Sequence, residues 1–235
     1  MTKFYETTKQ NSRKNCALER AIIETNINTF LFDIPQPSVW LGLKVSSNFF
    51  VKNNKKNIEM TRHNGVCGAM YFNGENIKIN LLVPDDGNGY STPREWVKKS
   101  LEDLGVTTTA LNEKDSRLFI GDKKIMGLTI TKIGDKNFIS MYLLLKHDFE
   151  TTAEVLTSTD GQSVTKENSI GINQATDINI TIEQVKSSLK ARFFEFFGED
   201  LVDSKLPKDI INRQNYNFDN IFNQEWWIKY GRLYE

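Results

Sequence analysis

The chain has 235 residues, of which 39% are hydrophobic, and its 30 Lys and Arg side chains balance 30 Asp and Glu side chains. A net charge of zero argues against a protein that holds nucleic acid through its phosphates. Only two cysteines are present, Cys16 and Cys67, which argues against a disulfide scaffold or a zinc site. With no long apolar run and no apolar leader, the sequence predicts a cytoplasmic protein that does not contact membranes.

The first elements follow from the spacing of apolar residues. An apolar stripe at helical spacing predicts a helix over 12–25, capped by Ser12. Short runs rich in aromatic and β-branched residues predict strands over 30–34, 39–45 and 77–83.

The middle of the chain carries a helix and a hairpin. Thr92-Pro-Arg-Glu95 has the form of a capping box and predicts a helix over 93–104. The dipeptide Gly121-Asp122 separates two apolar runs and predicts a tight turn between two strands. A further strand is predicted over 137–145.

The last third begins with a polar segment over 157–175, which predicts a loop. Thr181-Ile-Glu-Gln184 is a second capping box, and it predicts a helix over 182–197 that ends at Gly198. The aromatic segment that starts at Glu225 is expected to pack back onto the body of the protein. The chain is therefore predicted to be one α+β domain over 1–235, with a mixed β-sheet, sandwich-like core and helices around it. The helices over 93–104 and 182–197 are expected to cover one side of the sheet.

Short motifs add a family resemblance. The motifs and the family patterns that they match are Asn15-Cys-Ala-Leu-Glu-Arg20 (N-x-A-x-E-E), Thr61–Tyr71 (R-R-x-S-G-G-G-A-V-F), Asn76 (G-N), Asp122–Gly127 (K-(I/V)-S-G) and Leu143–Asp148 (L-L-L-N-x-D). In this order and spacing they resemble the catalytic domain of lipoate–protein ligase A, within the biotin/lipoate ligase superfamily.

The resemblance implies an activity and a set of partners. The family activates lipoate or octanoate with ATP and Mg²⁺ as an acyl-adenylate, and then passes the acyl group to a lysine of a lipoyl-carrier domain. Lys124 stands at the position of the reactive lysine, although a solvated lysine in an ordinary hairpin is the plainer interpretation of that segment alone. The residues that the resemblance assigns to binding of the substrate and nucleotide are Arg62, His63, Gly65, Gly68, Ala69, Asn76 and Gly127. No protein-bound metal site is expected.

Several positions depart from the family pattern. Val66-Cys67 replaces two glycines, His63 replaces an arginine, and Ser140-Met-Tyr142 replaces the small H-G-T. Cys67 is interpreted as structural, because no base is placed beside it. The family's C-terminal accessory domain is expected to be absent, which suggests a separate accessory subunit. The alternative hypothesis is a binding or regulatory module that has lost catalysis, and it predicts that Val66, Met141 or Tyr142 fills the cleft beside Lys124.

Overall fold

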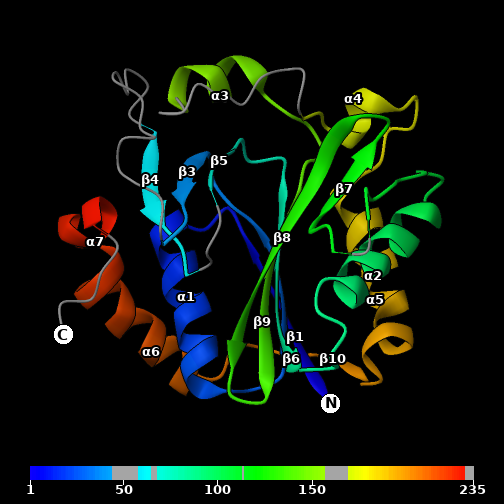
Figure 1. Ribbon diagram of the computed structural model, residues 1–235. Helices are drawn as coiled ribbons and strands as arrows, with labels where there is room; N and C mark the ends of the chain where they lie inside the picture. The colour runs from blue at the N-terminus through cyan, green and yellow to red at the C-terminus, as the bar shows by residue number, and fades with distance from the viewer. Residues whose placement is uncertain (44–57, 65–67, 113, 157–168, 231–235) are drawn as a thin grey trace.

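The computed structural model describes residues 1–43, 58–64, 68–112, 114–156 and 169–230. Within these ranges the chain forms a seven-stranded sheet with the order β10-β1-β2-β6-β9-β8-β7 (Figure 1). β1 pairs in parallel with both β10 and β2, and the remaining neighbours are antiparallel, so the predicted mixed sheet is confirmed. The strands are β1 (Thr2–Thr8), β2 (Thr29–Ile34), β6 (Ile77–Pro84), β7 (Arg117–Ile120), β8 (Lys123–Ile133), β9 (Lys136–Leu143) and β10 (Leu201–Asp203).

One face of this sheet is covered by α2 (Ser91–Glu102) and α5 (Ile182–Phe197), as the sequence predicts (Figure 1). Their aromatic side chains meet on β2: the ring of Phe30 lies 5.3 Å from that of Trp96 and 5.7 Å from that of Phe193, between centroids. All three side chains are fully buried. Burial of aromatic area of this size dominates the stability of such a layer.

The opposite face is also covered. α1 (Ser12–Thr25) and α6 (Lys208–Asn217) pack there, with Leu18 and Ile210 against Leu31 and Phe138 of the sheet. A three-stranded sheet, ordered β4-β3-β5, packs against α1 through Trp40 and Phe72. Its strands are β3 (Ser38–Leu41), β4 (Glu59–Arg62) and β5 (Ala69–Phe72). The helices therefore cover both faces of the large sheet. β2 and β6 direct Phe30, Phe32, Ile77 and Ile79 to one face, and Leu31 and Leu82 to the other.

The helix ends test the capping predictions. The box at Thr181 is confirmed: its hydroxyl accepts from the Gln184 amide at 3.2 Å, and its own amide donates to the Gln184 side chain at 2.9 Å. The box at Thr92 is wrong, because α2 starts at Ser91, two residues earlier than predicted, and the Thr92 hydroxyl donates instead to Asp86. The predicted cap at Ser12 is also wrong, since Asn11 accepts from the first amides of α1.

Short elements and chain ends were harder to predict. β1, β10, α3 (Phe149–Val155), α6 and the short helix η2 (Phe218–Phe222) were not foreseen, and α4 (Ile172–Ala175) lies in the predicted loop, of which 157–168 fall outside the described residues. The strand expected over 39–45 ends at Leu41. The aromatic tail forms α7 (Glu225–Tyr230), and Trp227 is only 4% exposed, so its predicted packing onto the body is confirmed.

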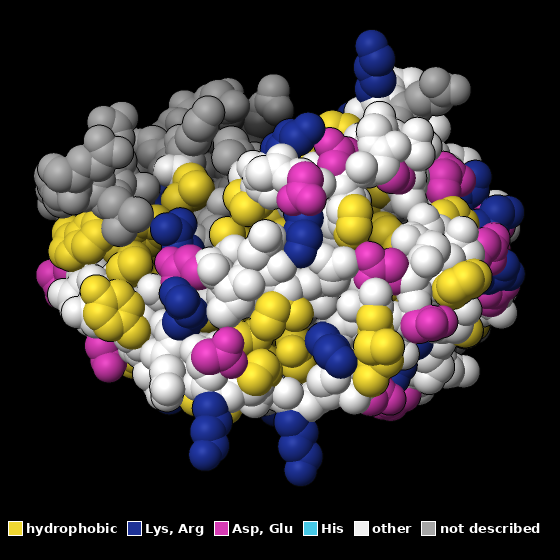
Figure 2. All heavy atoms as spheres, turned by 90° about the horizontal axis from the view of Figure 1, so that it is seen from below, with side chains coloured by type: hydrophobic (Ala, Val, Ile, Leu, Met, Phe, Trp, Pro, Cys, Tyr) yellow, Lys and Arg dark blue, Asp and Glu magenta, His cyan; other side chains and the backbone are white. Residues whose placement is uncertain are grey.

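The helices and the surface charge bear on possible contacts with a membrane or with charged partners. No helix within the described ranges combines the length and apolarity that crossing a bilayer requires. On the face seen from below, Lys and Arg side chains are intermingled with Asp and Glu side chains rather than gathered in one patch (Figure 2).

Candidate functional site

A cleft of ≈ 330 Å³ lies between the small sheet and the end of the large sheet that carries β6–β9. One wall comes from the end of β4 and from β5, and consists of His63, Gly68, Ala69 and Met70. The other wall comes from the large sheet and includes Lys78, Arg117, Lys124, Gly127, Thr129 and Ser140. The cleft beside Lys124 is therefore open. Met141 and Tyr142 line it without filling it, and Val66 lies outside the described residues.

The register of the sheet explains why this wall is polar. Cross-strand partners stand side by side on one face, and successive residues of a strand point to opposite faces. Lys78 pairs with Tyr142, which pairs with Gly127, and Asn80 pairs with Ser140, which pairs with Thr129. The intervening residues of β6, Ile77 and Ile79, point into the main core.

Lys124 is carried into the cleft by the hairpin of β7 and β8. Gly121 adopts a φ of 62° in the connecting turn, a conformation that glycine accepts without strain. The Nζ atom of Lys124 lies 4.8 Å from the centroid of the Tyr142 ring, within range of a cation–π contact. Its backbone carbonyl accepts from the amide of Ile170 at 3.0 Å. Both the side chain and the backbone of Lys124 are thus held in place, and the residue remains partly exposed.

The two glycines of the cleft differ in what surrounds them. A Cβ atom added at Gly68 would meet nothing within 4 Å, so this wall leaves room for a ligand. A Cβ added at Gly127 would lie 2.8 Å from the Tyr142 ring. Gly127 therefore makes room for Tyr142, which in turn lies beneath Lys124.

His63 forms part of the inner wall of the cleft and is 1% exposed. Burial lowers its pKa well below the ordinary value, and the nearby cations Lys78 and Arg62 lower it further. The ring is therefore neutral near pH 7. It therefore adds no positive charge to the cleft.

Two of the residues assigned from the sequence lie outside this lining. The guanidinium of Arg62 donates to the backbone carbonyls of Gly42 (2.6 Å), Leu43 (3.5 Å), Trp227 (3.2 Å) and Ile228 (3.0 Å). The indole of Trp227 donates back to the Arg62 carbonyl at 3.0 Å. Arg62 therefore holds α7 against β4. Asn76 is buried and accepts from the amide of Lys146 at 3.4 Å. Gly65 and Cys67 lie outside the described residues.

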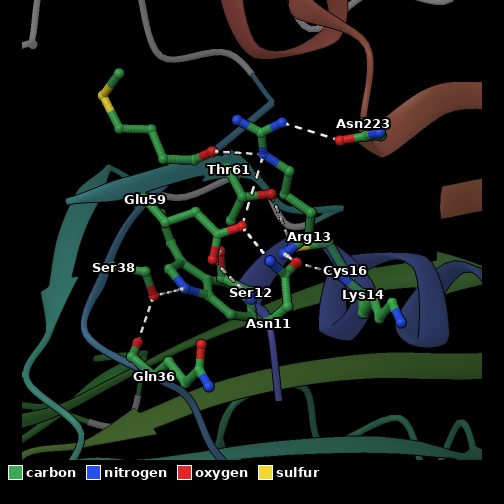
Figure 3. A network of polar contacts seen from close by, with 12 residues as sticks. Asn11, Ser12, Arg13, Lys14, Cys16, Gln36, Ser38, Glu59, Thr61 and Asn223 are labelled. Atoms are coloured by element: carbon green, nitrogen blue, oxygen red, sulfur yellow. Dashed lines mark hydrogen bonds and ion pairs between the residues drawn. The ribbon is translucent and has the colours of Figure 1, made fainter. Parts of the chain in front are cut away.

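The other end of β4 is anchored on α1 (Figure 3). The Glu59 carboxylate accepts hydrogen bonds from the side chain of Asn11 (2.6 Å) and from the amide and hydroxyl of Ser12 (3.0 and 2.7 Å). An anion is favoured at this position, because the first amides of a helix are unpaired and carry partial positive charge. Arg13 extends the network to Asn223 at 3.2 Å. Both ends of the strand that leads to His63 are therefore fixed.

Sequence reasoning missed several residues of the large-sheet wall. Lys78 is the most informative of them, because its side chain lines the cleft and is nevertheless 1% exposed. The signal was present in Ile77-Lys-Ile-Asn80, where alternation places both polar side chains on one face. No group of three or more His, Cys, Asp and Glu in the described part of the chain is arranged to hold a metal ion.

Comparison with known proteins shows which family the chain resembles. Residues 11–194 match the model of the lipoyl protein ligase A/B catalytic domain. The chain belongs to this family. It is also 24% identical over 151 residues to lipoate–protein ligase 1 of Staphylococcus aureus. That match covers 60% of this chain and 45% of the staphylococcal protein, less than half of its length.

Solved structures agree on the fold of this lipoyl ligase family member. A lipoate–protein ligase A bound with ATP superposes with a TM-score of 0.85 at 20% identity, covering 98% of each chain. A bi-partite lipoate protein ligase from Thermoplasma acidophilum superposes with a TM-score of 0.86 at 21% identity, covering 100% of this chain and 97% of the other. P. falciparum LipL1 in complex with lipoate superposes with a TM-score of 0.75 at 14% identity. The match covers 100% of this chain and 75% of LipL1. The biotin/lipoate ligase-like fold expected from the motifs is thus confirmed.

Proposed function

We propose that this chain is a lipoate–protein ligase that activates a lipoate- or octanoate-like acid with ATP and transfers the acyl group to a lysine of a lipoyl-carrier domain. The observation that carries the proposal is the position of Lys124, which the β7–β8 hairpin holds at an open cleft. Membership of the family and the ATP-bound relative support it.

The first step brings two anions together. A carboxylate oxygen of the acid bonds to the α-phosphorus of ATP, and the bond to pyrophosphate breaks. Lys124 would offset the repulsion between the two anions and donate hydrogen bonds to the developing charge. In the second step the carrier's lysine amine attacks the acyl carbon, AMP leaves, and the amine loses a proton.

The residues of the cleft fit an anionic substrate. Lys124 and Arg117 both line it, and the Arg117 Nε atom is held by Asp115 at 2.8 Å. The open space beside Gly68 would let a phosphate or an acyl chain approach the backbone, and the adjacent Ala69 is small. His63 would form a neutral wall. Mg²⁺ is proposed to arrive with the nucleotide, bound to its phosphates.

Arg62, Asn76 and Gly127 are proposed to act indirectly. Arg62 would keep β4 and α7 together beside the nucleotide, and Gly127 would keep Tyr142 beneath Lys124. Asn76 would support the segment around Lys146. Gly65 stays a candidate for phosphate binding on the basis of the family motif alone.

The proposed partners follow the relatives. The Thermoplasma ligase is described as bi-partite and is paired with its E2 lipoyl domain. We propose a lipoyl-carrier domain as the acyl acceptor here, a separate accessory subunit as a second partner, and the cytoplasm as the location. The chain is proposed to act as one catalytic domain.

A second candidate function is a binding module without ligase activity. The observation that favours it is the presence of Met141 and Tyr142 in the cleft lining, where the family motif has small residues. Such a module would bind the acid or a preformed acyl-adenylate. It would neither synthesise the adenylate from ATP nor acylate a carrier lysine.

The deciding experiment is incubation with ATP, Mg²⁺ and lipoate or octanoate, followed by mass spectrometry for the acyl-adenylate. A second reaction adds a lipoyl-carrier domain and measures the mass gain of its lysine. Formation of the adenylate and of the modified carrier supports the ligase. Binding of an acyl-adenylate mimic by calorimetry, with no turnover in either reaction, favours the module.

A further inference from the structure

The large-sheet wall of the cleft is backed by a buried ion pair. Lys78 of β6 and Glu19 of α1 form a direct salt bridge, and each side chain is only 1% exposed. The Lys78 ammonium also donates to the side-chain oxygen of Asn80 at 3.1 Å and lies 4.6 Å from the centroid of the Trp40 ring. Lys78 nevertheless belongs to the cleft lining.

The ammonium retains a hydrogen that these contacts do not use. It has three N–H donors, of which Glu19 and Asn80 accept two, while an aromatic face accepts only weakly. Within the described residues, the third donor is left to the Trp40 ring and to the cleft that Lys78 lines. Since Glu19 already balances the charge, this donor suits a neutral oxygen acceptor better than a second anion.

The neighbouring positions of the same face are also polar. Ser140 pairs with both Asn80 and Thr129 across the sheet, and Ser140 and Thr129 both line the cleft. We name Lys78, Thr129 and Ser140, which all line the cleft, the polar row. An unsubstituted alkyl chain lying on this row would return no hydrogen bond to the third Lys78 donor or to the Thr129 and Ser140 hydroxyls, and polar groups left unpaired under a ligand weaken its binding.

We propose that the polar row selects acids whose chain carries a neutral oxygen substituent, a hydroxyl or a keto group, over unsubstituted alkanoates of the same length. The inference rests on the proposed function in one respect, since it takes the carboxylate to lie at Lys124. The substituent accepts from Lys78, and a hydroxyl also donates to Ser140 or Thr129.

The test compares octanoate with hydroxy- and oxo-octanoates substituted at carbons 5 to 8. Calorimetric binding to the full chain is measured without ATP, and kcat/KM for adenylate formation is measured with ATP. At least one substituted acid is expected to bind roughly tenfold more tightly than octanoate, the ratio that one additional hydrogen bond gives. Equal or tighter binding of octanoate than of every substituted acid overturns the inference. Selective binding without any adenylate would overturn the proposed function and leave the inference standing.

Variants locate the selectivity in the polar row. The double substitution Ser140→Ala with Thr129→Val keeps side-chain volume nearly constant, and it is expected to reduce the preference several-fold. Thr131→Val is the matched control, because Thr131 lies on the same strand but outside the cleft lining. Lys78→Met is combined with Glu19→Gln so that no buried charge is left without a partner, and this pair is expected to abolish the preference. An unchanged preference in both double variants contradicts the assignment.

Discussion

Gly127 and Tyr142 pair directly across β8 and β9, and the Tyr142 ring fills the space that a side chain at Gly127 would need. The same ring lies beneath the ammonium of Lys124. The glycine that follows the lysine by three residues therefore acts on the cleft through a tyrosine.

The first prediction concerns Gly127→Ala. The new Cβ would lie 2.8 Å from the tyrosine ring, so the ring must move out of the sheet and disturb Lys124. We expect a loss of stability of about 1–3 kcal/mol, typical of overpacking, and a larger relative loss of adenylate formation. Urea unfolding and the mass-spectrometric assay measure the two effects.

Two further variants control this experiment. Gly68→Ala adds the same methyl group where nothing lies within 4 Å, and it should leave the free energy of unfolding nearly unchanged. Tyr142→Thr, placed on the Gly127→Ala background, should restore stability. If the double variant is no more stable than Gly127→Ala alone, the clash is not the cause.

The second prediction separates Lys124 from an ordinary surface lysine. Lys124→Met should lower adenylate formation roughly 10²–10³-fold, as removal of a charge-stabilising donor does, with little change in stability. Lys123→Met is the matched control, because Lys123 is adjacent on β8 but does not line the cleft. Similar activity in the two variants would remove Lys124 from the proposed mechanism.

The third prediction tests the position of Arg62. A lysine there cannot reach all of these carbonyls, so Arg62→Lys should destabilise the protein by about 2–4 kcal/mol. Arg20→Lys is the control, since the Arg20 side chain is 37% exposed and pairs on the surface with Glu24. Denaturant unfolding and ATP calorimetry are measured on both. A weaker affinity for ATP with unchanged stability would show that Arg62 binds phosphate and does not hold α7.

The fourth prediction is a pH dependence of stability. Burial raises the pKa of Asp33 to about 7, although its carboxylate accepts from Thr7 (2.8 Å) and Asn15 (2.7 Å). The folded state then keeps a proton that the unfolded chain releases near its ordinary pKa of 3.8. Stability contributed by this group is therefore present below about pH 4 and is lost as the pH rises to about 7, by up to about 4 kcal/mol.

Asp33→Asn keeps the shape of the side chain and removes the titration. The difference in the free energy of unfolding between pH 5 and pH 8 should therefore be smaller in the variant than in the unchanged protein. Equal differences in the two proteins would show that Asp33 is ionised throughout this range.

Local sequence determined the elements whose causes are local. The box at Thr181 and Gly198 set both ends of α5, because capping involves only atoms within a turn of the helix end. Gly121 set the hairpin that carries Lys124, since its positive φ is a property of that residue. Alternation in β6 was sufficient to place Lys78 on one face. The order of short motifs was sufficient to identify the family.

Only the tertiary structure decided the contacts between distant segments. Arg62 looked like a phosphate ligand until α7 placed the Trp227 and Ile228 carbonyls against it. The motif around Gly127 gave no sign that Tyr142 fills the adjacent space. Glu59 and Glu19 are ordinary acidic residues in the sequence, and the fold makes one an anchor at the start of α1 and the other the buried partner of Lys78. These roles depend on which strands and helices pack together, and residue spacing within one segment carries no information about that packing.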